Sequence, residues 1–259
     1  IMPSLVGSEM CIRDSPEVHS ALQEMPMLKL PTYSSASDEN ITIILHNIQS
    51  LNKHINDLKK DTRFRNADVI CLTETWLRSE QNINEFNVNG YQFYHAVRED
   101  SYNDNSSQLA KLQAAKGGGV AVDLNERGLE KSVISISRKN IEGIGVKFVS
   151  ENIVLLTVYR PSSYTVSNFL NYLQKVIDSF RSQNKCFVCI GDFNEDAQSV
   201  GPIQTFMSEK GLTQIVGFYT TEGGTILDHV YSTSSLQIDV TKLPTYYSCL
   251  LYTSPSPRD

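Results

Sequence analysis

The chain has 259 residues, of which 40% are hydrophobic and 20% are charged, and its formal net charge is −6 at pH 7. This size is enough to bury a substantial core, and we expect one large domain. No apolar run approaches the roughly 18 residues needed to cross a bilayer, so we expect a soluble protein without membrane association. The acidic balance excludes DNA binding that relies on net positive charge, so any DNA contact must be local, cation-assisted or supplied by another domain.

The two ends of the chain resemble translated sequencing adapter. One choice of codons for residues 249–259 has a reverse complement that, in a shifted frame, encodes LVGSEMCIRD, which is residues 5–14. No fold produces such a relation between its ends, so residues 1–15 and 249–259 are predicted to be adapter-derived and unstructured. These ends carry three acidic and two basic residues, which leaves a net charge of −5 for the rest.

The segment 16–40 is rich in Pro, Ser and Met without clear periodicity, so it is predicted to be a linker, and the domain is expected over 41–248. Strands and helices mix there without strict alternation, which favours sheets packed on each other with helices outside. In chain order the patterns predict ITIILHN, helix 51–61, ADVICLTE, GYQFYHA, a polar surface loop over 98–116, GGGVAVDL, the paired strands GIGVKFV and NIVLLTVYR, helix 166–181, KCFVCIGDFN, helix 201–210 and GGTILDHVYS.

Five of these strands end in polar residues on one face. Side chains two apart along a strand share a face, so the apolar face of each strand continues into its polar end. If the ends converge, one mouth holds three carboxylates, two amides and a phenol. Carboxylate oxygens suit a hard cation such as Mg²⁺, and neutral amides can hold a phosphate without repelling it. The residues are Asn47, Glu74, Tyr159, Asp192 with Asn194, and Asp228.

Six short motifs, in order, resemble those of the endonuclease/exonuclease/phosphatase superfamily: HNIQSL, LTETWL, GGGVAV, VYRP, GDFN and LDHVY. This superfamily includes abasic-site endonucleases, DNase I, inositol-phosphate phosphatases, sphingomyelinases and the endonucleases of non-LTR retrotransposons and some helicase-linked transposons. The resemblance covers residues 41–248. It implies a four-layered α/β sandwich of the DNase I type, in which two mixed β-sheets pack face to face with helices outside. It also implies a divalent cofactor, Mg²⁺ or Mn²⁺.

The resemblance assigns roles around a metal-bound phosphate. Glu74 would ligate the metal, and Asn47 would assist at the metal or the phosphate. Tyr159 would contact the scissile phosphate, and Asn194 would hold it. Asp192 would position or deprotonate the attacking water.

Asp228 matches the aspartate that orients the catalytic histidine of the family. That histidine belongs to a later Ser-Asp-His motif, which is not found before Ser248. We therefore expect a domain truncated before its catalytic histidine, lacking its last strand or strands and having little or no activity. His229 is the alternative histidine, but neighbours in a strand face opposite sides, so a structural role is predicted for it.

The order ETWL, GGG, YRP and GDFN is most similar to the endonuclease domains of non-LTR retrotransposons and helicase-linked transposons. This implies a DNA-nicking endonuclease that works beside other domains of a mobile-element polyprotein, inside the cell and in the nucleus. Two alternatives remain open. One is a phosphoesterase acting on inositol phosphates or sphingolipids, and the other is a catalytically dead interaction domain, because fold-level analogy does not separate them.

Several residues with reactive or aromatic side chains are predicted to be structural. Cys186 and Cys189 have the spacing of a metal pair, but CFVCIG is typical of a buried strand. Together with Cys71 they suit a reducing compartment. Trp76 and Phe193 are interpreted as packing residues. The three glycines of GGGVAV permit a close backbone approach or a bulge.

Overall fold

The computed structural model describes residues 24–31, 40–102, 106–136, 139–181 and 186–244. Both predicted adapter-derived ends, and Ser248, lie outside these ranges. No helix in the described ranges is both long enough and apolar enough to cross a membrane.

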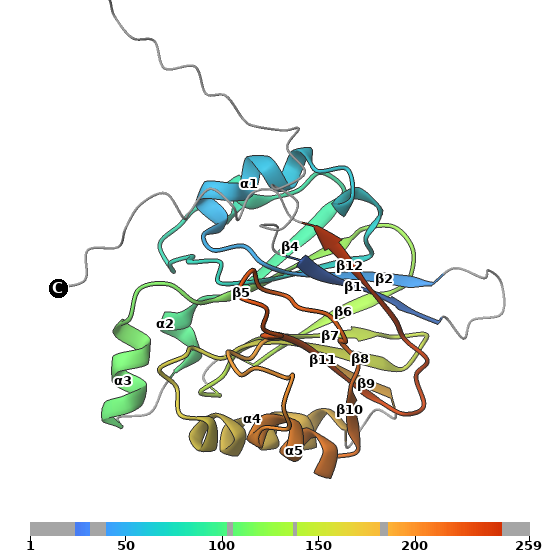
Figure 1. Cartoon of the computed structure of the whole chain (residues 1–259). Helices are drawn as coiled ribbons and strands as arrows, with labels where there is room; N and C mark the ends of the chain where they lie inside the picture. Colours follow the sequence, from blue (N-terminus) through green and yellow to red (C-terminus); the bar gives the residue numbers. More distant parts are fainter. Residues whose placement is uncertain (1–23, 32–39, 103–105, 137–138, 182–185, 245–259) are drawn as a thin grey trace, which may run out of the picture.

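Two six-stranded mixed sheets form the centre of the molecule (Figure 1). The first sheet has the order β12-β1-β2-β3-β5-β4 and the second has the order β10-β11-β9-β8-β7-β6. The first is built from β12 (Asp239–Pro244), β1 (Glu24–Leu30), β2 (Ile41–Asn47), β3 (Val69–Thr73), β5 (Val120–Asn125) and β4 (Tyr91–Ala96). The second is built from β10 (Leu212–Gln214), β11 (Asp228–Thr233), β9 (Cys186–Asp192), β8 (Ile153–Tyr159), β7 (Glu142–Phe148) and β6 (Lys131–Ser135).

Each sheet contains one parallel pair, flanked on both sides by antiparallel neighbours. The pairs are β2 with β3 and β8 with β9. The chain passes between the strands of each pair through a helix, as parallel pairing requires a crossover. The carboxyl ends of the two pairs lie at the same edge of the sandwich, and this placement brings strand-end residues from both sheets together.

Helices cover the outer faces of the two sheets, which makes four layers (Figure 1). On α4, buried Phe169, Leu173, Val176, Ile177 and Phe180 recur at helical spacing and form the stripe that packs on the second sheet. The described fold is therefore the predicted four-layered α/β sandwich of the DNase I type, which is confirmed. The helices are α1 (Leu51–Lys60), η2 (Phe64–Asn66), η3 (Ile83–Phe86), α2 (Arg98–Ser101), α3 (Ser107–Ala114), α4 (Val166–Arg181) and α5 (Pro202–Glu209).

The first sheet begins earlier than predicted. The linker prediction over 16–40 is wrong for Glu24–Leu30, which forms β1 and pairs antiparallel with both β2 and β12. Leu28 and Leu30 are fully buried in the core between the sheets. Pro26 argues against a central strand, but the pairing with β2 covers only Met27 to Leu30, so no ladder hydrogen bond to β2 is lost.

The polar segment 98–116 is not the surface loop that its composition predicts. It contains α2 and α3, and Leu109 and Leu112 of α3 are buried in the core that lies over the second sheet. The N-cap Ser106 accepts a hydrogen bond from the backbone N–H of Leu109. The apolar residues are few but stand three apart, which is enough to anchor one face of a two-turn helix.

Candidate active site

The predicted site residues lie where the two central parallel pairs end. Asn47 is paired with Thr73 at the ends of β2 and β3, and Glu74 follows directly. In the second sheet Asp192, at the end of β9, is paired with Tyr159 on one side and with Asp228 on the other. The structure therefore brings Asn47, Glu74, Tyr159, Asp192 and Asp228 to one edge of the sandwich.

Hydrogen bonds join these residues across the two sheets. The side-chain amide of Asn47 donates to Asp192 Oδ2 at 2.8 Å and to Glu74 Oε1 at 3.1 Å. The hydroxyl of Tyr159 donates to the same Glu74 oxygen at 3.2 Å. Neutral donors thus sit between two carboxylates that would otherwise repel each other.

Glu74 is partly exposed and is held from both sides. Its Oε2 accepts a hydrogen bond from the indole Nε1 of Trp76 at 3.2 Å. Glu74 and Trp76 both have a left-handed backbone, with φ of +52° and +57°, a conformation that non-glycine residues adopt at some cost. Trp76 was expected to be a packing residue, and its bond to Glu74 is a contact that sequence reasoning missed.

The two aspartates are buried and electrostatically coupled. Burial raises the pKa of Asp192 to about 7, against the opposing effect of the Asn194 backbone N–H at 2.9 Å and the Asn47 amide. Burial, and then the charge of Asp192, hold the pKa of Asp228 well above its ordinary range. Such a pair resists double ionisation until a cation or a donor compensates it. Asp228 Oδ1 has no hydrogen-bond partner among the described residues.

Asn194 turns the chain after β9 rather than extending the strand. Its φ is +49°, and its side-chain amide donates to the backbone carbonyl of Arg160 at 2.8 Å. Part of its donor capacity is therefore used within the protein, and one N–H is left to donate to a phosphate.

Arg160 is a site residue to which sequence reasoning gave no role. Its guanidinium donates to the backbone carbonyls of Phe193, Tyr164 and Asn194 at 2.6, 2.6 and 2.7 Å. The group is buried and pins the loop that follows β9, and its charge opposes the rise in the pKa of Asp192. A charged residue directly after a strand that is apolar except for Thr157 and Tyr159 was the available signal.

His229 faces away from Asp228, as expected for neighbours in a strand. Its ring stacks on Phe193 with a centroid distance of 4.9 Å, and its nitrogens lie 2.9 Å from the Tyr231 hydroxyl and 2.7 Å from the Glu195 carbonyl. Burial lowers the pKa of His229 to about 4. These contacts give His229 and the fully buried Phe193 structural roles.

The donors fit a hard divalent cation. Glu74 and Asp192 offer carboxylate oxygens on either side of Asn47, whose amide nitrogen faces them; a flip of this amide would turn its oxygen toward a cation as a further ligand. No three His, Cys, Asp or Glu side chains in the described ranges form a metal-holding group. Magnesium usually takes only one or two protein carboxylates and completes its shell with water and phosphate, so this sparse set suits it. Cys186 and Cys189 are free and make no such site.

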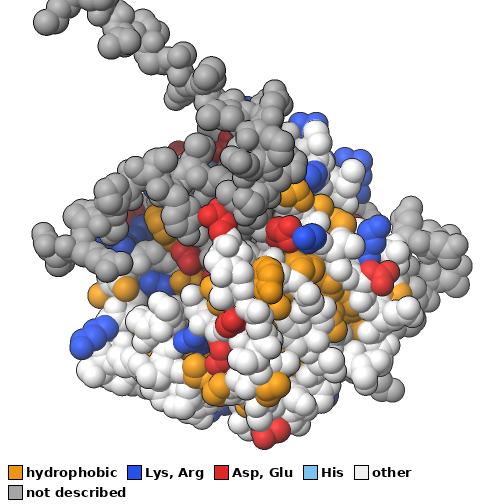
Figure 2. Space-filling view, in the orientation of Figure 1, with side chains coloured by type: hydrophobic (Ala, Val, Ile, Leu, Met, Phe, Trp, Pro, Cys, Tyr) orange, Lys and Arg blue, Asp and Glu red, His pale blue; other side chains and the backbone are white. Residues whose placement is uncertain are grey.

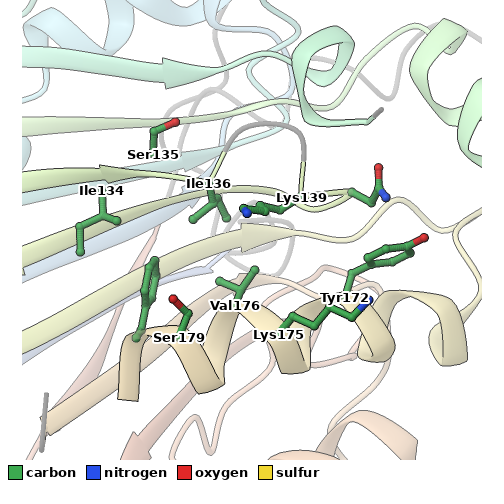
Figure 3. A pocket seen from close by; sticks show the side chains of 10 residues that line it. Ile134, Ser135, Ile136, Lys139, Tyr172, Lys175, Val176 and Ser179 are labelled. Atoms are coloured by element: carbon green, nitrogen blue, oxygen red, sulfur yellow. The ribbon is translucent and has the colours of Figure 1, made fainter. Parts of the chain in front are cut away.

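Two cavities lie outside this group of residues. One of about 340 Å³ separates α4 from Ile134 and Ile136 near the end of β6, and none of its lining residues is a predicted site residue (Figure 3). The other is an open groove of about 670 Å³ formed by the segment 217–226 with Glu24 and Lys242. Its wall residue Ile226 is two residues before Asp228, so this groove borders the site.

Comparisons with known proteins find chains of the same fold. A comparison with curated protein sequences finds no match. Among solved structures, the endonuclease domain of TRAS1, a telomere-specific non-LTR retrotransposon, is 13% identical with a TM-score of 0.53, and the match covers 74% of this chain and 84% of that one. An AP endonuclease from Archaeoglobus fulgidus is 16% identical with a TM-score of 0.51, and the match covers 74% and 86% of the two chains.

A third similar structure is a 3′ phosphatase from Neisseria bound to a product DNA hairpin. It is 13% identical with a TM-score of 0.51, and the match covers 74% of this chain and 86% of that one. At these identities the three structures show the fold. A family model matches residues 44–249, which is most of the chain, and this match includes every predicted site residue. The chain belongs to the endonuclease/exonuclease/phosphatase family.

Proposed function

We propose that this chain is a divalent-cation-dependent phosphodiesterase domain that nicks DNA and comes from a mobile element. Family membership supports a phosphoester hydrolase. The observation that carries the cation-dependent phosphodiesterase proposal is the hydrogen bonding of Asn47 to Glu74 and Asp192 together, which makes one oxygen-rich mouth from the strand ends of both sheets.

The residues of the mouth divide into groups that hold a cation and groups that act on a phosphodiester. Glu74, with Asn47, would hold Mg²⁺ or Mn²⁺. When bound, such an ion polarises the phosphoryl oxygen and offsets charge on the leaving oxygen. Asn194 would donate its remaining N–H to a phosphate oxygen, and Tyr159 would do so once its single hydroxyl hydrogen turns from Glu74 to the substrate. These phosphate oxygens gain charge in the transition state.

The two aspartates would handle protons and orientation. Asp192, whose pKa burial raises to about 7, is poised to orient the attacking water and accept its proton near neutral pH. Asp228 Oδ1 is buried and has no hydrogen-bond partner among the described residues, so it can orient a further group, for which the family resemblance implies a histidine.

DNA as substrate is supported by the TRAS1 likeness and by the ETWL-type motifs, which also favour a nuclear protein with other mobile-element domains. Figure 2 shows Lys and Arg scattered among Asp and Glu over the uncovered part of one face, rather than gathered there in one basic patch. Phosphate neutralisation would then rest on the bound cation and on few basic contacts. A modest salt dependence of DNA binding follows from this arrangement.

The groove beside Asp228 offers a place for nucleotides that flank the cleaved bond. Its wall includes Tyr219, which is 55% exposed and so presents an aromatic face to solvent. Bases stack on such faces without regard to sequence. The groove therefore supports a polymeric substrate over a small phosphorylated molecule.

The test compares DNA nicking with phosphate release. The assay uses the chain extended with the sequence that follows it in the source transcript, beside the 259-residue chain, on supercoiled plasmid and on inositol polyphosphates. We expect nicking by the extended chain with Mg²⁺ or Mn²⁺, none in excess chelator, and no comparable turnover of inositol polyphosphate. The reverse preference would assign the domain to the phosphatase branch, and inactivity on both would favour an interaction domain.

A further inference from the structure

A buried ion pair lies behind the candidate site, in a segment to which sequence reasoning gave no chemistry. The Arg98 side chain is 7% exposed, that of Glu142 is fully buried, and Arg98 Nε donates to Glu142 Oε1 at 2.7 Å. Glu142 also accepts hydrogen bonds from the Tyr102 hydroxyl at 2.9 Å and from the backbone N–H of Gly119. Burying such a pair is costly compared with burying apolar residues of the same volume, which points to a role beyond stability.

One side of the pair bears on Tyr159. Glu142 lies directly opposite Tyr159 in the antiparallel pairing of β7 and β8, so their side chains share a face. Arg98 Cζ lies 5.8 Å from the centre of the Tyr159 ring, within the range of a cation–π contact. The Tyr159 hydroxyl in turn donates to Glu74 Oε1. The ion pair thus orients the phenol ring of Tyr159, and the Tyr159 hydroxyl in turn fixes the position of Glu74 Oε1.

The other side of the pair contacts the turn formed by Gly117, Gly118 and Gly119, here called the glycine turn. Arg98 Nη1 donates to the Lys116 carbonyl at 3.2 Å, and the guanidinium lies so close to Gly118 that a Cβ there would overlap it. The Gly118 carbonyl accepts the backbone N–H of Trp76 at 2.8 Å, and the Trp76 indole donates to Glu74 Oε2. Arg98 therefore also influences the position of Glu74 Oε2, through the glycine turn and then Trp76.

The segment from Glu74 to Trp76 needs support from the surrounding structure. Glu74 and Trp76 both hold left-handed backbone conformations, which persist only where surrounding structure maintains them. The glycine turn supplies that support through two carbonyls, and Arg98 with Glu142 fixes the turn itself.

We propose that Arg98 and Glu142 form a positioning unit for the carboxylate of Glu74, setting one oxygen through Tyr159 and the other through the glycine turn and Trp76. This inference rests on the proposed function in that Glu74 is taken as a cation ligand. It predicts that loosening the pair weakens cation binding although neither residue touches the cation.

The sole tryptophan of the chain makes the test direct. Trp76 donates to Glu74, so Mn²⁺ bound at Glu74 will quench its fluorescence without any turnover being required. Mn²⁺ is titrated into the full 259-residue chain, Arg98→Lys and Glu74→Gln. Lysine keeps the charge, but as a point donor it cannot span both Glu142 and the Lys116 carbonyl. We expect the half-saturating Mn²⁺ concentration of Arg98→Lys to rise about tenfold, the size of effect seen when supports of a metal ligand are removed.

The matched control is Arg63→Lys. Arg63 pairs with Asp61 at the far end of α1 from the site, so Mn²⁺ affinity is expected to stay at the wild-type value. If Arg98→Lys loses its far-UV circular dichroism spectrum, Tyr102→Phe replaces it; this variant deletes one hydrogen bond to Glu142 and should raise half-saturation about threefold, by a weaker form of the same effect.

Each outcome decides a different point. Wild-type quenching that Glu74→Gln abolishes, with weaker Mn²⁺ binding in folded Arg98→Lys, supports the positioning unit. The same wild-type and Glu74→Gln behaviour with unchanged affinity in Arg98→Lys, or in Tyr102→Phe where that variant is used, overturns the unit and leaves the proposed function standing. No saturable quenching in the wild type, or quenching that Glu74→Gln retains, removes Glu74 as the cation ligand and the inference with it.

Discussion

Asn47→Ala should destabilise the chain by an amount that depends on pH. Asn47 donates to Asp192, which is buried with a pKa raised to about 7, and to Glu74, which is partly exposed. A hydrogen bond to an ionised group contributes about 1.5–3 kcal/mol and one between neutral groups about 1 kcal/mol. At pH 5 Asp192 is mostly protonated in the folded state, so we expect a loss of about 1 kcal/mol, since the hydrogen bond to the partly exposed Glu74 adds little. At pH 8 Asp192 is ionised, and we expect a loss of about 3 kcal/mol.

The direction follows from proton linkage. The folded pKa of Asp192 lies above its unfolded value, so wild-type stability falls as pH rises from about 4 to about 7 through this group. Asn47 favours the ionised form and limits that fall, and its removal extends the fall to higher pH. Urea unfolding followed by far-UV circular dichroism, in chelator at pH 5 and pH 8, measures the effect. Asn168→Ala, on the exposed face of α4, is the control. Equal losses at both pH values would refute the assigned contact.

Four further variants probe the site and its surroundings. Asp192→Asn in the extended chain should lower the nicking rate by at least about 10², since it removes the group that acts on the nucleophile, while circular dichroism shows an intact fold. Glu74→Gln should raise the Mg²⁺ concentration needed for half-maximal nicking and lower the rate. Because burial lowers the folded pKa of His229 to about 4, below the 6.5 of the unfolded chain, stability should fall by up to about 3 kcal/mol between pH 6.5 and 4; His229→Gln should remove that part of the slope in urea titrations. Tyr219→Ala should weaken binding of labelled DNA by about 1–3 kcal/mol in fluorescence anisotropy without loss of folding, and unchanged affinity would exclude the groove as a nucleotide surface.

The alternation of side chains along strands was enough to predict which residues reach the site edge. Asn47 and Asp192 each continue an apolar strand face and lie at the ends of β2 and β9. Asp228 was expected at a strand end, but it begins β11, and it reaches the same edge because β11 runs antiparallel to β9. Helix α4 spans the predicted residues because its apolar stripe is long and regular. The local sequence pattern is enough to predict these elements because each of them buries one face, and the spacing of its apolar residues shows which face that is.

Residues whose roles depend on distant partners could not be predicted in this way. Arg98 stands in a polar stretch, and nothing near it indicates that Glu142, 44 positions later, will bury it. Strand β1 contains Pro26, and it pairs with β2, which follows it, and with β12 at the far end of the described chain. Asn194 was assigned to the phosphate from its motif, but part of its amide is used to hold the Arg160 carbonyl. Long-range pairing decided each of these cases, and a single sequence does not display it.

The division of the site between two sheets has a consequence for how activity can be switched on. Asn47 and Glu74 come from the part of the chain before residues 126–130, and Tyr159, Asp192 and Asp228 come from the part after it. A backbone cut in that connection would leave neither fragment with a complete mouth. The strand β12 crosses back from the second part to pair with β1, and the ion pair of Lys242 with Glu24 reinforces this pairing. If the two fragments are expressed separately, the first carries β1 and the second carries β12, so each has a strand that can pair with the other fragment. Mn²⁺ would then quench the fluorescence of Trp76 only when the fragments are mixed.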